Sequence, residues 1–268
     1  PVVAIELKNQ LTGQSVDDAM RHWEYNRNPK EYAFGFNKRV LAYFACDLYN
    51  VYMTTQLNGA ETVFLPFNQG SNGAGKDGGA GNPTTEDGKY VTSYFWENVL
   101  QKDKLLDILQ KFISYERSEK KKIMPDGSTK TTVSSKVIFP RYHQLDVVRK
   151  LVSHVRENGA GHNYLIQHSA GSGKSNSIAW TAYRMASLHD ENNNPIFDSV
   201  IIVTDRRVLD QQLQATVSGF DHTLGSVVTI NEKKNSGDLR DAINEGKRII
   251  ISTLQKFPVI YDEVHSSV

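Results

Sequence analysis

The sequence has little of several features that would fix its class at once. Its 268 residues include one cysteine, Cys46, so an intrachain disulfide is impossible. Lysine and arginine number 31 against 30 acidic residues, so bulk charge does not indicate a nucleic-acid binder, and any such surface must be a local patch. We find no charged-then-apolar leader, no apolar run of bilayer length and no internal repeat. We therefore expect a soluble, cytoplasmic protein.

The composition of the whole chain supports a packed core. Hydrophobic residues make up 39% of the sequence and charged residues 23%, which argues against global disorder.

The first half of the chain predicts an α/β domain. The chain opens on Pro1–Ile5, which reads as a buried strand with nothing before it, so we expect a piece of a longer protein. The predicted elements are a strand over 2–8, a helix over 17–25 with Ser15 as N-cap, strands within 40–67, and a helix over 93–115.

The order of predicted helices and strands changes after a predicted hairpin. Residues 120–122 are three consecutive lysines, Pro125-Asp-Gly127 is a turn signal, and 133–139 reads as the returning strand. We place the domain boundary in this hairpin, which divides the chain into 1–118, a linker over 119–138, and 139–268. In the last part helices alternate with strands that are apolar throughout. Such strands are expected to be buried on both faces, which predicts a parallel sheet covered by helices. The predicted helices are 144–156, 175–188, 208–217 and 239–245, and the strands are 164–167, 199–204, 227–229 and 248–252.

A glycine-rich segment lies between the predicted strand 164–167 and the helix that follows. It reads His168-Ser-Ala-Gly-Ser-Gly-Lys-Ser175, in the strand-to-helix context that a phosphate-binding loop requires, with His168 at the motif's first glycine position. The ordinary alternative is a glycine turn with a solvated lysine. We expect Lys174 to bind the β- and γ-phosphates of ATP and Ser175 to bind Mg²⁺. Backbone N–H groups and a helix N-terminus favour phosphate here, and the loop residues are Ala170, Gly171, Ser172 and Gly173.

Other polar residues stand where ATP-driven nucleic-acid motors place theirs. Gln144 begins a predicted helix upstream of the loop, and its amide offers the donor and acceptor that match an adenine edge. Alone, such a glutamine is more often a surface residue. Thr204 and Arg206 follow a predicted strand, at the edge where parallel sheets bind ligands, and are candidates for a nucleic-acid phosphate contact. Helix capping by Asp205 is the alternative reading of that segment.

A second candidate ATPase motif lies near the end of the sequence. Val259-Ile-Tyr-Asp-Glu-Val-His265 reads as apolar residues followed by D-E-x-H, in which Asp262 holds magnesium through water and Glu263 polarises the attacking water. Pro258 interrupts the short strand before it, and the motif follows Lys256 too closely for a full crossover. Either the match is fortuitous or residues are missing before the motif.

In combination these segments resemble one known family. The chain is similar, over essentially its whole length, to the restriction subunit of type I restriction–modification enzymes, which is the motor and nuclease subunit. That family implies a PD-(D/E)xK-type nuclease domain, here N-terminally truncated, then a RecA-like P-loop domain, here C-terminally truncated. It also implies double-stranded DNA as substrate, with modification (methyltransferase) and specificity subunits as partners. The resemblance rests on Gln167–Ser175, Val203–Arg206, Ser252–Phe257, Thr62–Asn68 and Gly81–Pro83.

The start of the chain matches half of the nuclease motif. In Ile5-Glu-Leu-Lys8, Glu6 and Lys8 fall on the same face of a strand because side chains alternate. Alone, E-x-K is weak, and two surface charges are the ordinary reading. The resemblance implies that Glu6 binds Mg²⁺ and that Lys8 orients water or stabilises developing phosphate charge. His22 and Trp23 stand where the family often has a glutamine and a tyrosine.

Three functions are therefore open. The leading one is an ATP-dependent DNA translocase and endonuclease that cuts unmodified DNA in host defence. A superfamily-two helicase with a non-nucleolytic N-terminal domain would leave Glu6 and Lys8 unpaired, and no third acidic ligand would approach them. A non-enzymatic DNA- or protein-binding module with a degenerate ATPase would be insensitive to a change at Lys174.

Overall fold

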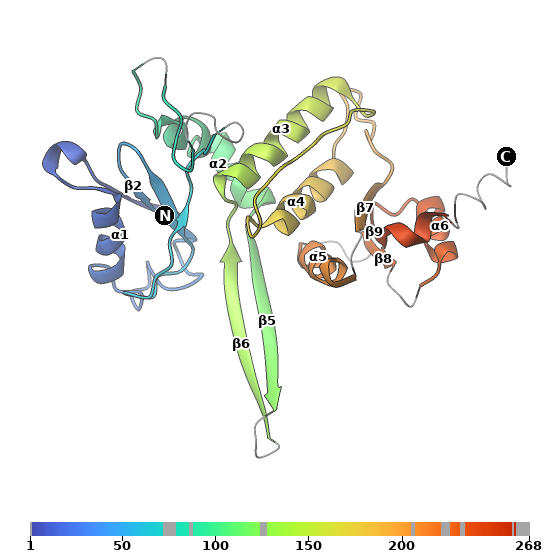
Figure 1. The fold of residues 1–268 in the computed structure, drawn as a ribbon, viewed down its shortest axis with the longest axis horizontal. Coiled ribbons are helices and arrows are strands. Elements are labelled where there is room, and N and C mark those ends of the chain that lie inside the picture. The colour runs from blue at the N-terminus through green and yellow to red at the C-terminus, as the bar shows by residue number, and fades with distance from the viewer. Residues whose placement is uncertain are drawn as a thin grey trace. The chain divides into compact units, whose positions relative to one another are not determined.

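The chain divides into two compact units, Pro1–His143 and Gln144–Val268 (Figure 1). The computed structural model describes residues 2–71, 79–85, 88–123, 128–204, 207–220, 226–230, 234–258 and 260. Within these residues no helix is both long and apolar enough to cross a bilayer. The whole is a mixed α/β structure with parallel strand pairing in each unit.

A four-stranded sheet with the order β1-β2-β3-β4 forms the core of the first unit. The strands expected over 2–8 and within 40–67, and the helix expected over 17–25, are confirmed. Helix α1 makes the crossover between the parallel strands β1 and β2, and the other two strands continue the sheet antiparallel. The bounds are β1 (Val3–Leu7), a 3₁₀ turn (Gln10–Thr12), α1 (Val16–Tyr25), β2 (Ala42–Cys46), β3 (Val51–Thr54) and β4 (Leu65–Pro66).

Strand β2 is buried along its whole length, and aromatic rings cover both of its faces. On the α1 side Tyr43 packs edge-on against Trp23, with ring centroids 5.3 Å apart. Trp23 Nε1 also donates a hydrogen bond to the Phe44 carbonyl at 3.0 Å, which fixes α1 on the strand. On the opposite face the Phe44 ring packs against three further rings, those of Phe67, Phe95 and Phe139.

Asp47, directly after β2, ties the β2–β3 turn to α1. Its side chain is buried, and Oδ2 accepts a hydrogen bond of 2.9 Å from the N–H of Val16, the first residue of α1. Oδ1 accepts two more, from the N–H groups of Tyr49 at 2.8 Å and Asn50 at 2.7 Å. One carboxylate therefore satisfies an orphan N–H of the helix and closes the turn.

The single cysteine also lies in this buried strand. Cys46 is buried, and loss of hydration, followed by the negative charge of Asp47, raises the pKa of its thiol to about 12. Because the thiolate is the nucleophilic form, the thiol is unreactive near neutral pH.

The single helix expected over 93–115 is wrong. The structure has a π-helical turn, Phe95–Val99, then α2, Lys102–Lys111. Gln101 is extended between them, with φ −54° and ψ 141°. This break turns the chain so that Phe95 and Val99 of the first piece, and Ile108 of the second, are all buried, which one continuous helix face would not achieve.

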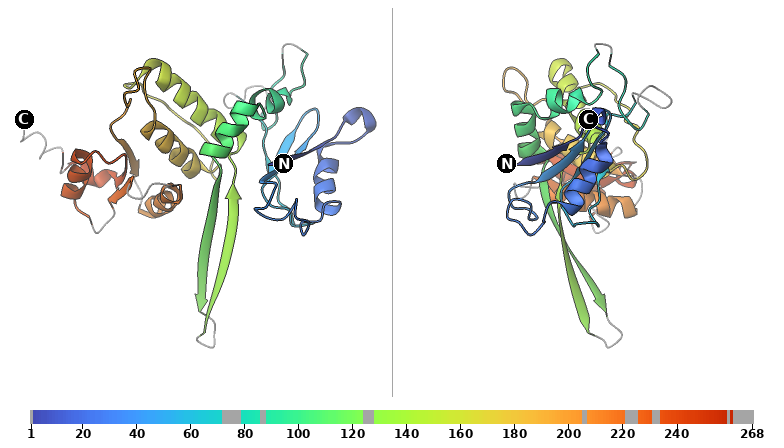
Figure 2. Two further views of the ribbon diagram at one scale, coloured as in Figure 1. Left: turned by 180° about the vertical axis from the view of Figure 1, so that it is seen from behind. Right: turned by 90° about the vertical axis from the view of Figure 1, so that its left-hand side faces the viewer.

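A two-stranded antiparallel hairpin follows α2. Strand β5 (Ser114–Ile123) pairs with β6 (Thr129–Ile138) in ten cross-strand pairs. Figures 1 and 2 show these strands extending from the rest of the first unit as a long arm. The returning strand expected over 133–139 is confirmed, and it begins earlier than expected.

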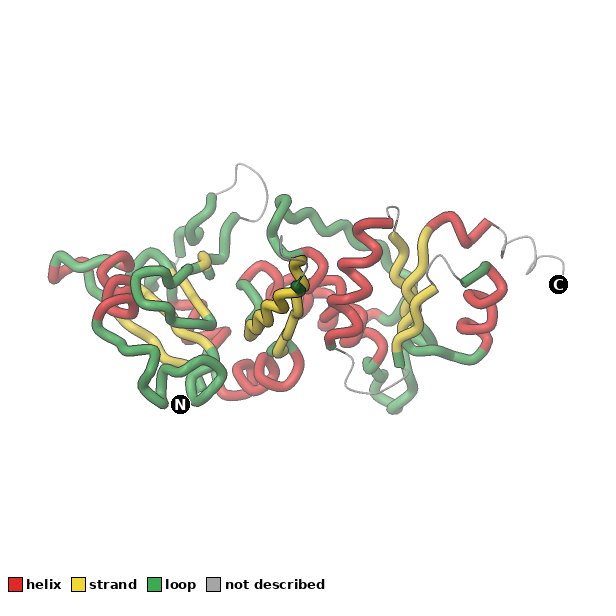
Figure 3. Tube along the Cα trace, turned by 90° about the horizontal axis from the view of Figure 1, so that it is seen from below, coloured by secondary structure: helices red, strands yellow, loops and turns green. Residues whose placement is uncertain are grey.

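The second unit contains a three-stranded parallel sheet with the order β7-β9-β8. The predicted parallel sheet and its four predicted helices are confirmed. Helices α4 and α5 lie on one side of the sheet and α6 on the other (Figure 3). The bounds are α3 (Tyr142–Asn158), α4 (Lys174–Ala186), β7 (Val200–Thr204), α5 (Arg207–Gly219), β8 (Val227–Ile230), α6 (Ser236–Asn244), β9 (Ile249–Thr253) and a 3₁₀ turn (Leu254–Lys256).

One predicted strand of this unit is not formed. Tyr164–Gln167 is irregular, and Leu165 is 95% exposed. The expectation that every strand is buried on both faces holds for β9 but is wrong for β7, where Ile201 and Val203 are exposed. A short apolar segment becomes a strand only beside a partner, and among the described residues β7 pairs with β9 alone.

We expect Asp47→Ala to lower the free energy of unfolding of the first unit by about 2–4 kcal/mol, because three backbone N–H groups lose their acceptor. Denaturant unfolding measures the loss. Asp17→Ala, at an exposed position in the first turn of the same helix, is the control and should change stability by less than about 1 kcal/mol. Equal effects of the two substitutions would contradict the role given to Asp47.

Candidate functional site

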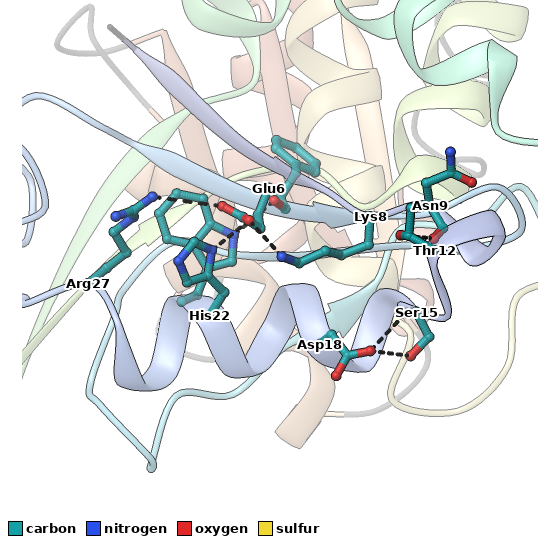
Figure 4. Close-up of polar contacts among 10 residues, drawn as sticks. Glu6, Lys8, Asn9, Thr12, Ser15, Asp18, His22 and Arg27 are labelled. Carbon is teal, nitrogen blue, oxygen red and sulfur yellow. Dashed lines mark hydrogen bonds and ion pairs between the residues drawn. The ribbon is translucent and has the colours of Figure 1, made fainter.

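Glu6 of β1 and Lys8, the residue directly after the strand, meet on the side that faces α1. Glu6 Oε1 and Lys8 Nζ are 3.2 Å apart, and each side chain is only 15% exposed (Figure 4). The expectation that strand alternation places both on one face is confirmed. They therefore form a largely shielded ion pair rather than two separate surface charges.

Two further basic residues approach the same carboxylate. His22, on α1, places Nδ1 2.5 Å from Glu6 Oε1, without the alignment of a hydrogen bond, so the contact is ionic when the ring is protonated. Arg27, just beyond the end of α1, places Nη2 4.0 Å from Glu6 Oε2. One carboxylate thus lies among lysine, histidine and arginine, an arrangement that favours the approach of an anion such as a phosphate.

The same cluster supplies only one carboxylate for a metal ion. Among the described residues no three His, Cys, Asp or Glu side chains come together as ligands. Magnesium prefers several oxygen ligands, and Glu6 Oε1 already contacts Lys8 and His22. The groups described here do not by themselves fit a magnesium site, and metal binding by Glu6 stays a prediction.

In the second unit, the loop before α4 has the backbone of a phosphate cradle. Gly171 and Gly173 have φ of 72° and 81°, a conformation that side-chain-bearing residues rarely adopt. Helix α4 begins at Lys174, so its N-terminal N–H groups open directly onto the loop. This backbone fits the phosphate role predicted for Ala170–Ser175, and Ser175 Oγ, in the first turn of α4, is the group that would hold the accompanying Mg²⁺.

The lysine of the loop is held by the loop itself. Lys174 Nζ donates hydrogen bonds to the carbonyls of Ser169 at 2.8 Å and His168 at 3.2 Å. A phosphate is a stronger partner for an ammonium than a neutral carbonyl. Nucleotide binding is therefore expected to exchange these two bonds for contacts with phosphate oxygens.

Gln144, in the first turn of α3, lies against this loop and is 3% exposed. Its Nε2 donates to the carbonyls of Gly173 at 2.8 Å and Ser172 at 3.3 Å. A Cβ atom on Gly173 would stand 2.5 Å from the same Nε2. The amide thus supports the loop directly, and its predicted contact with an adenine edge stays a prediction.

A mostly apolar cavity of about 620 Å³ adjoins the loop, between α4 and β7. Lys174 and Ser175 border it, as does Thr204 at the carboxyl end of β7. Thr204 is buried, and its predicted DNA contact stays a prediction. Ile166 also lines this space, so the unformed strand lies at its edge.

Three predicted site residues are not described by the structure, and two residues near Glu6 were not predicted as site residues. Arg206, Asp262 and Glu263 lie outside the described residues. Arg27 had not been predicted, because it belongs to no motif and follows the end of a helix. His22 had been noted only for its position in the resemblance, and its contact with Glu6 depends on how α1 packs.

His168 stands at the entry to the phosphate loop. Burial, followed by the positive charge of Lys174, lowers the pKa of its imidazole below the usual value, against a smaller opposing effect of Asp146. Near neutral pH the ring is therefore uncharged, and Lys174 supplies the positive charge of the loop.

Comparison with known proteins is informative for the second unit. Residues 143–267 match the family model of the SWI2/SNF2 ATPase. The match points to the helicase-like ATPase superfamily and to ATP hydrolysis. It does not single out a type I restriction subunit, and it does not extend to the first unit. No match was found among curated proteins or among solved structures.

We expect Gly173→Ala to destabilise the second unit more than Gly171→Ala. Both substitutions force a side chain into the left-handed region, which costs about 1–2 kcal/mol. Only the new Cβ at Gly173 displaces the buried Gln144 amide, which adds about 1–2 kcal/mol for the hydrogen bonds lost. Adding Gln144→Ala to each variant should abolish the difference between them in denaturant unfolding. Equal losses at the two glycines would contradict this geometry.

We expect Lys174→Ala to raise the pKa of His168, since it removes a neighbouring positive charge that favours the neutral ring. The NMR titration of the His168 ring protons measures the change. Arg184→Ala, a charge loss in the last turn of α4, is the control. An unchanged or lowered value in Lys174→Ala would show that burial alone sets this pKa.

Proposed function

We propose that the chain acts as the ATP-dependent DNA translocase and endonuclease subunit of a type I restriction enzyme. The observation that carries the proposal is the Glu6–Lys8 pair, 3.2 Å apart and shielded beneath α1, in a chain whose other unit matches an ATPase family. Lysine and glutamate are seldom shielded from solvent unless they are paired, and the E-x-K spacing of this pair is that of the nuclease motif in the family that the chain resembles.

On the ATPase side, Lys174 would contact the β- and γ-phosphates, and the N–H groups of the loop and of the start of α4 would bind the remaining oxygens. Magnesium, when bound, would neutralise phosphate charge, with Ser175 as its protein ligand. Gln144 would keep the loop in place through its two carbonyl contacts. Water activation is assigned by resemblance to Glu263.

On the nuclease side, Lys8 would place its ammonium beside the scissile phosphate and stabilise the charge that develops there. Glu6 would hold that ammonium in position through their ion pair. Arg27 would add positive charge for the DNA backbone at the same place.

The resemblance extends the proposal to partners and setting. We place the modification and specificity subunits beside this chain, unmodified double-stranded DNA as the substrate, and the cytoplasm as the location. Cutting this DNA would serve in host defence.

A superfamily-two helicase or ATPase with a non-nucleolytic N-terminal unit is the second candidate. It is favoured by the extent of the family match, 143–267, and by the lack of a three-ligand metal cluster among the described residues. The pairing of Glu6 with Lys8 differs from what this candidate predicted, and in that case the pair would only stabilise the packing of α1 on β1.

The deciding experiment compares ATP hydrolysis and duplex cleavage in the enzyme assembled with its modification and specificity subunits. Lys174→Ala should reduce both activities by on the order of 100-fold or more, because transition-state charge loses a fixed cation. Lys8→Ala should reduce cleavage by a similar factor and leave ATP hydrolysis unchanged. Lys30→Ala, at an exposed lysine of the same unit, is the matched control and should change neither.

Normal cleavage by Lys8→Ala would remove the nuclease proposal and leave the helicase candidate. Normal ATP hydrolysis by Lys174→Ala would remove both and favour a binding module.

A further inference from the structure

Buried residues and an ion pair anchor the base of the β5–β6 arm. Ser114 and Val137 are buried there, and Lys136 Nζ lies 2.8 Å from Glu116 Oε2 across the two strands. Tyr115 OH donates to Ser135 Oγ at 2.9 Å, which also joins the strands near the base. These contacts fix where the arm begins, and further out a hydrogen bond of 2.7 Å between Ser118 Oγ and Ser134 Oγ joins the two strands.

The outer part of the arm presents both of its faces to solvent. Every residue from Thr129 to Ser134 is exposed, although successive residues of a strand point to opposite faces. On the facing strand Arg117–Glu119 are exposed as well. A two-stranded ribbon with no apolar face gains little stability by itself. A ladder of ten cross-strand pairs is therefore better explained if a binding partner stabilises it.

Charge is segregated along the arm. Of the acidic residues, Glu116 lies near the base and is paired with Lys136, and Glu119 lies midway along the arm and is paired with Arg117. Beyond position 119 the sequence carries four lysines against one acidic residue, Asp126, which lies outside the described residues. The four lysines are Lys120, Lys121, Lys122 and Lys130.

Two of these lysines are direct neighbours across the ladder. Lys122 is the cross-strand partner of Lys130, and Lys120 follows two residues along, at a position on the same face of the ribbon. By the register of the backbone, three of the four lysines therefore occupy positions on one face of the ribbon. A polyanion that binds across this face would meet this local excess of positive charge.

We infer that the outer half of the β5–β6 arm is a binding surface for duplex DNA, with its lysines on the phosphates that border the major groove. Ten residues per strand extend about 30 Å. The major groove is about 12 Å wide and admits a two-stranded ribbon. The Ser and Thr residues between the lysines can donate to phosphates without selecting a sequence. The choice of DNA over an acidic protein rests on the proposed function.

The test measures duplex DNA affinity against salt concentration by fluorescence anisotropy, without nucleotide, in the complete enzyme. The variant is Lys120→Gln/Lys122→Gln/Lys130→Gln. Its control, Lys30→Gln/Lys102→Gln/Lys111→Gln, removes the same charge from exposed sites elsewhere in the unit. The arm variant should bind on the order of 10- to 100-fold more weakly near 0.1 M salt, with the slope of log K against log salt reduced by about 2–3. The matching Arg triple variant should retain the parental affinity, which separates charge from folding of the ribbon.

Parental affinity and slope in the arm Gln variant would overturn the inference. So would unchanged DNA binding combined with weaker retention of the modification or specificity subunits, which would make the arm a protein contact. ATP hydrolysis without DNA is expected to be the same in all three variants. A failure of the proposed function appears instead in the Lys8 and Lys174 variants, so the two failures are distinguishable.

Discussion

The burial of β2 on both faces is the constraint on which the first unit depends. A strand with aromatic rings on each side needs a helix across one face, and α1 meets that need where Trp23 reaches the Phe44 carbonyl. That position of α1 sets His22 opposite Glu6. The polar cluster on β1 is thus placed by packing several residues away, and a change in the core would move it.

The two candidate sites share an electrostatic arrangement. Lys8 is held by a carboxylate, and Lys174 is held by two main-chain carbonyls. Each ammonium is held by groups that belong to the same local segment, and under the proposed function each would meet a phosphate. Such preorganisation reduces the side-chain entropy lost on binding. It also lets each lysine remain partnered in the absence of its substrate.

Short-range patterns predicted much of this structure. Alternation in Ile5–Lys8 was sufficient to place Glu6 and Lys8 together, and apolar strands between amphipathic helices were sufficient for the parallel sheet. What failed depended on distant partners. Tyr164–Gln167 has strand composition but pairs with no strand among the described residues. The helix expected over 93–115 breaks because its two halves bury different residues. The approach of Arg27 to Glu6 follows no pattern, because only the path of the chain after α1 brings it there.

The buried thiol of Cys46 has a practical consequence for the site-specific labelling of this protein. With its one cysteine held in β2 and its pKa raised to about 12, the folded chain offers no surface thiol to a maleimide dye. A cysteine introduced at an exposed site such as Thr131 would then be the single point of attachment. Fluorescent reporters could be placed on this chain one at a time, without first removing a native residue from its core.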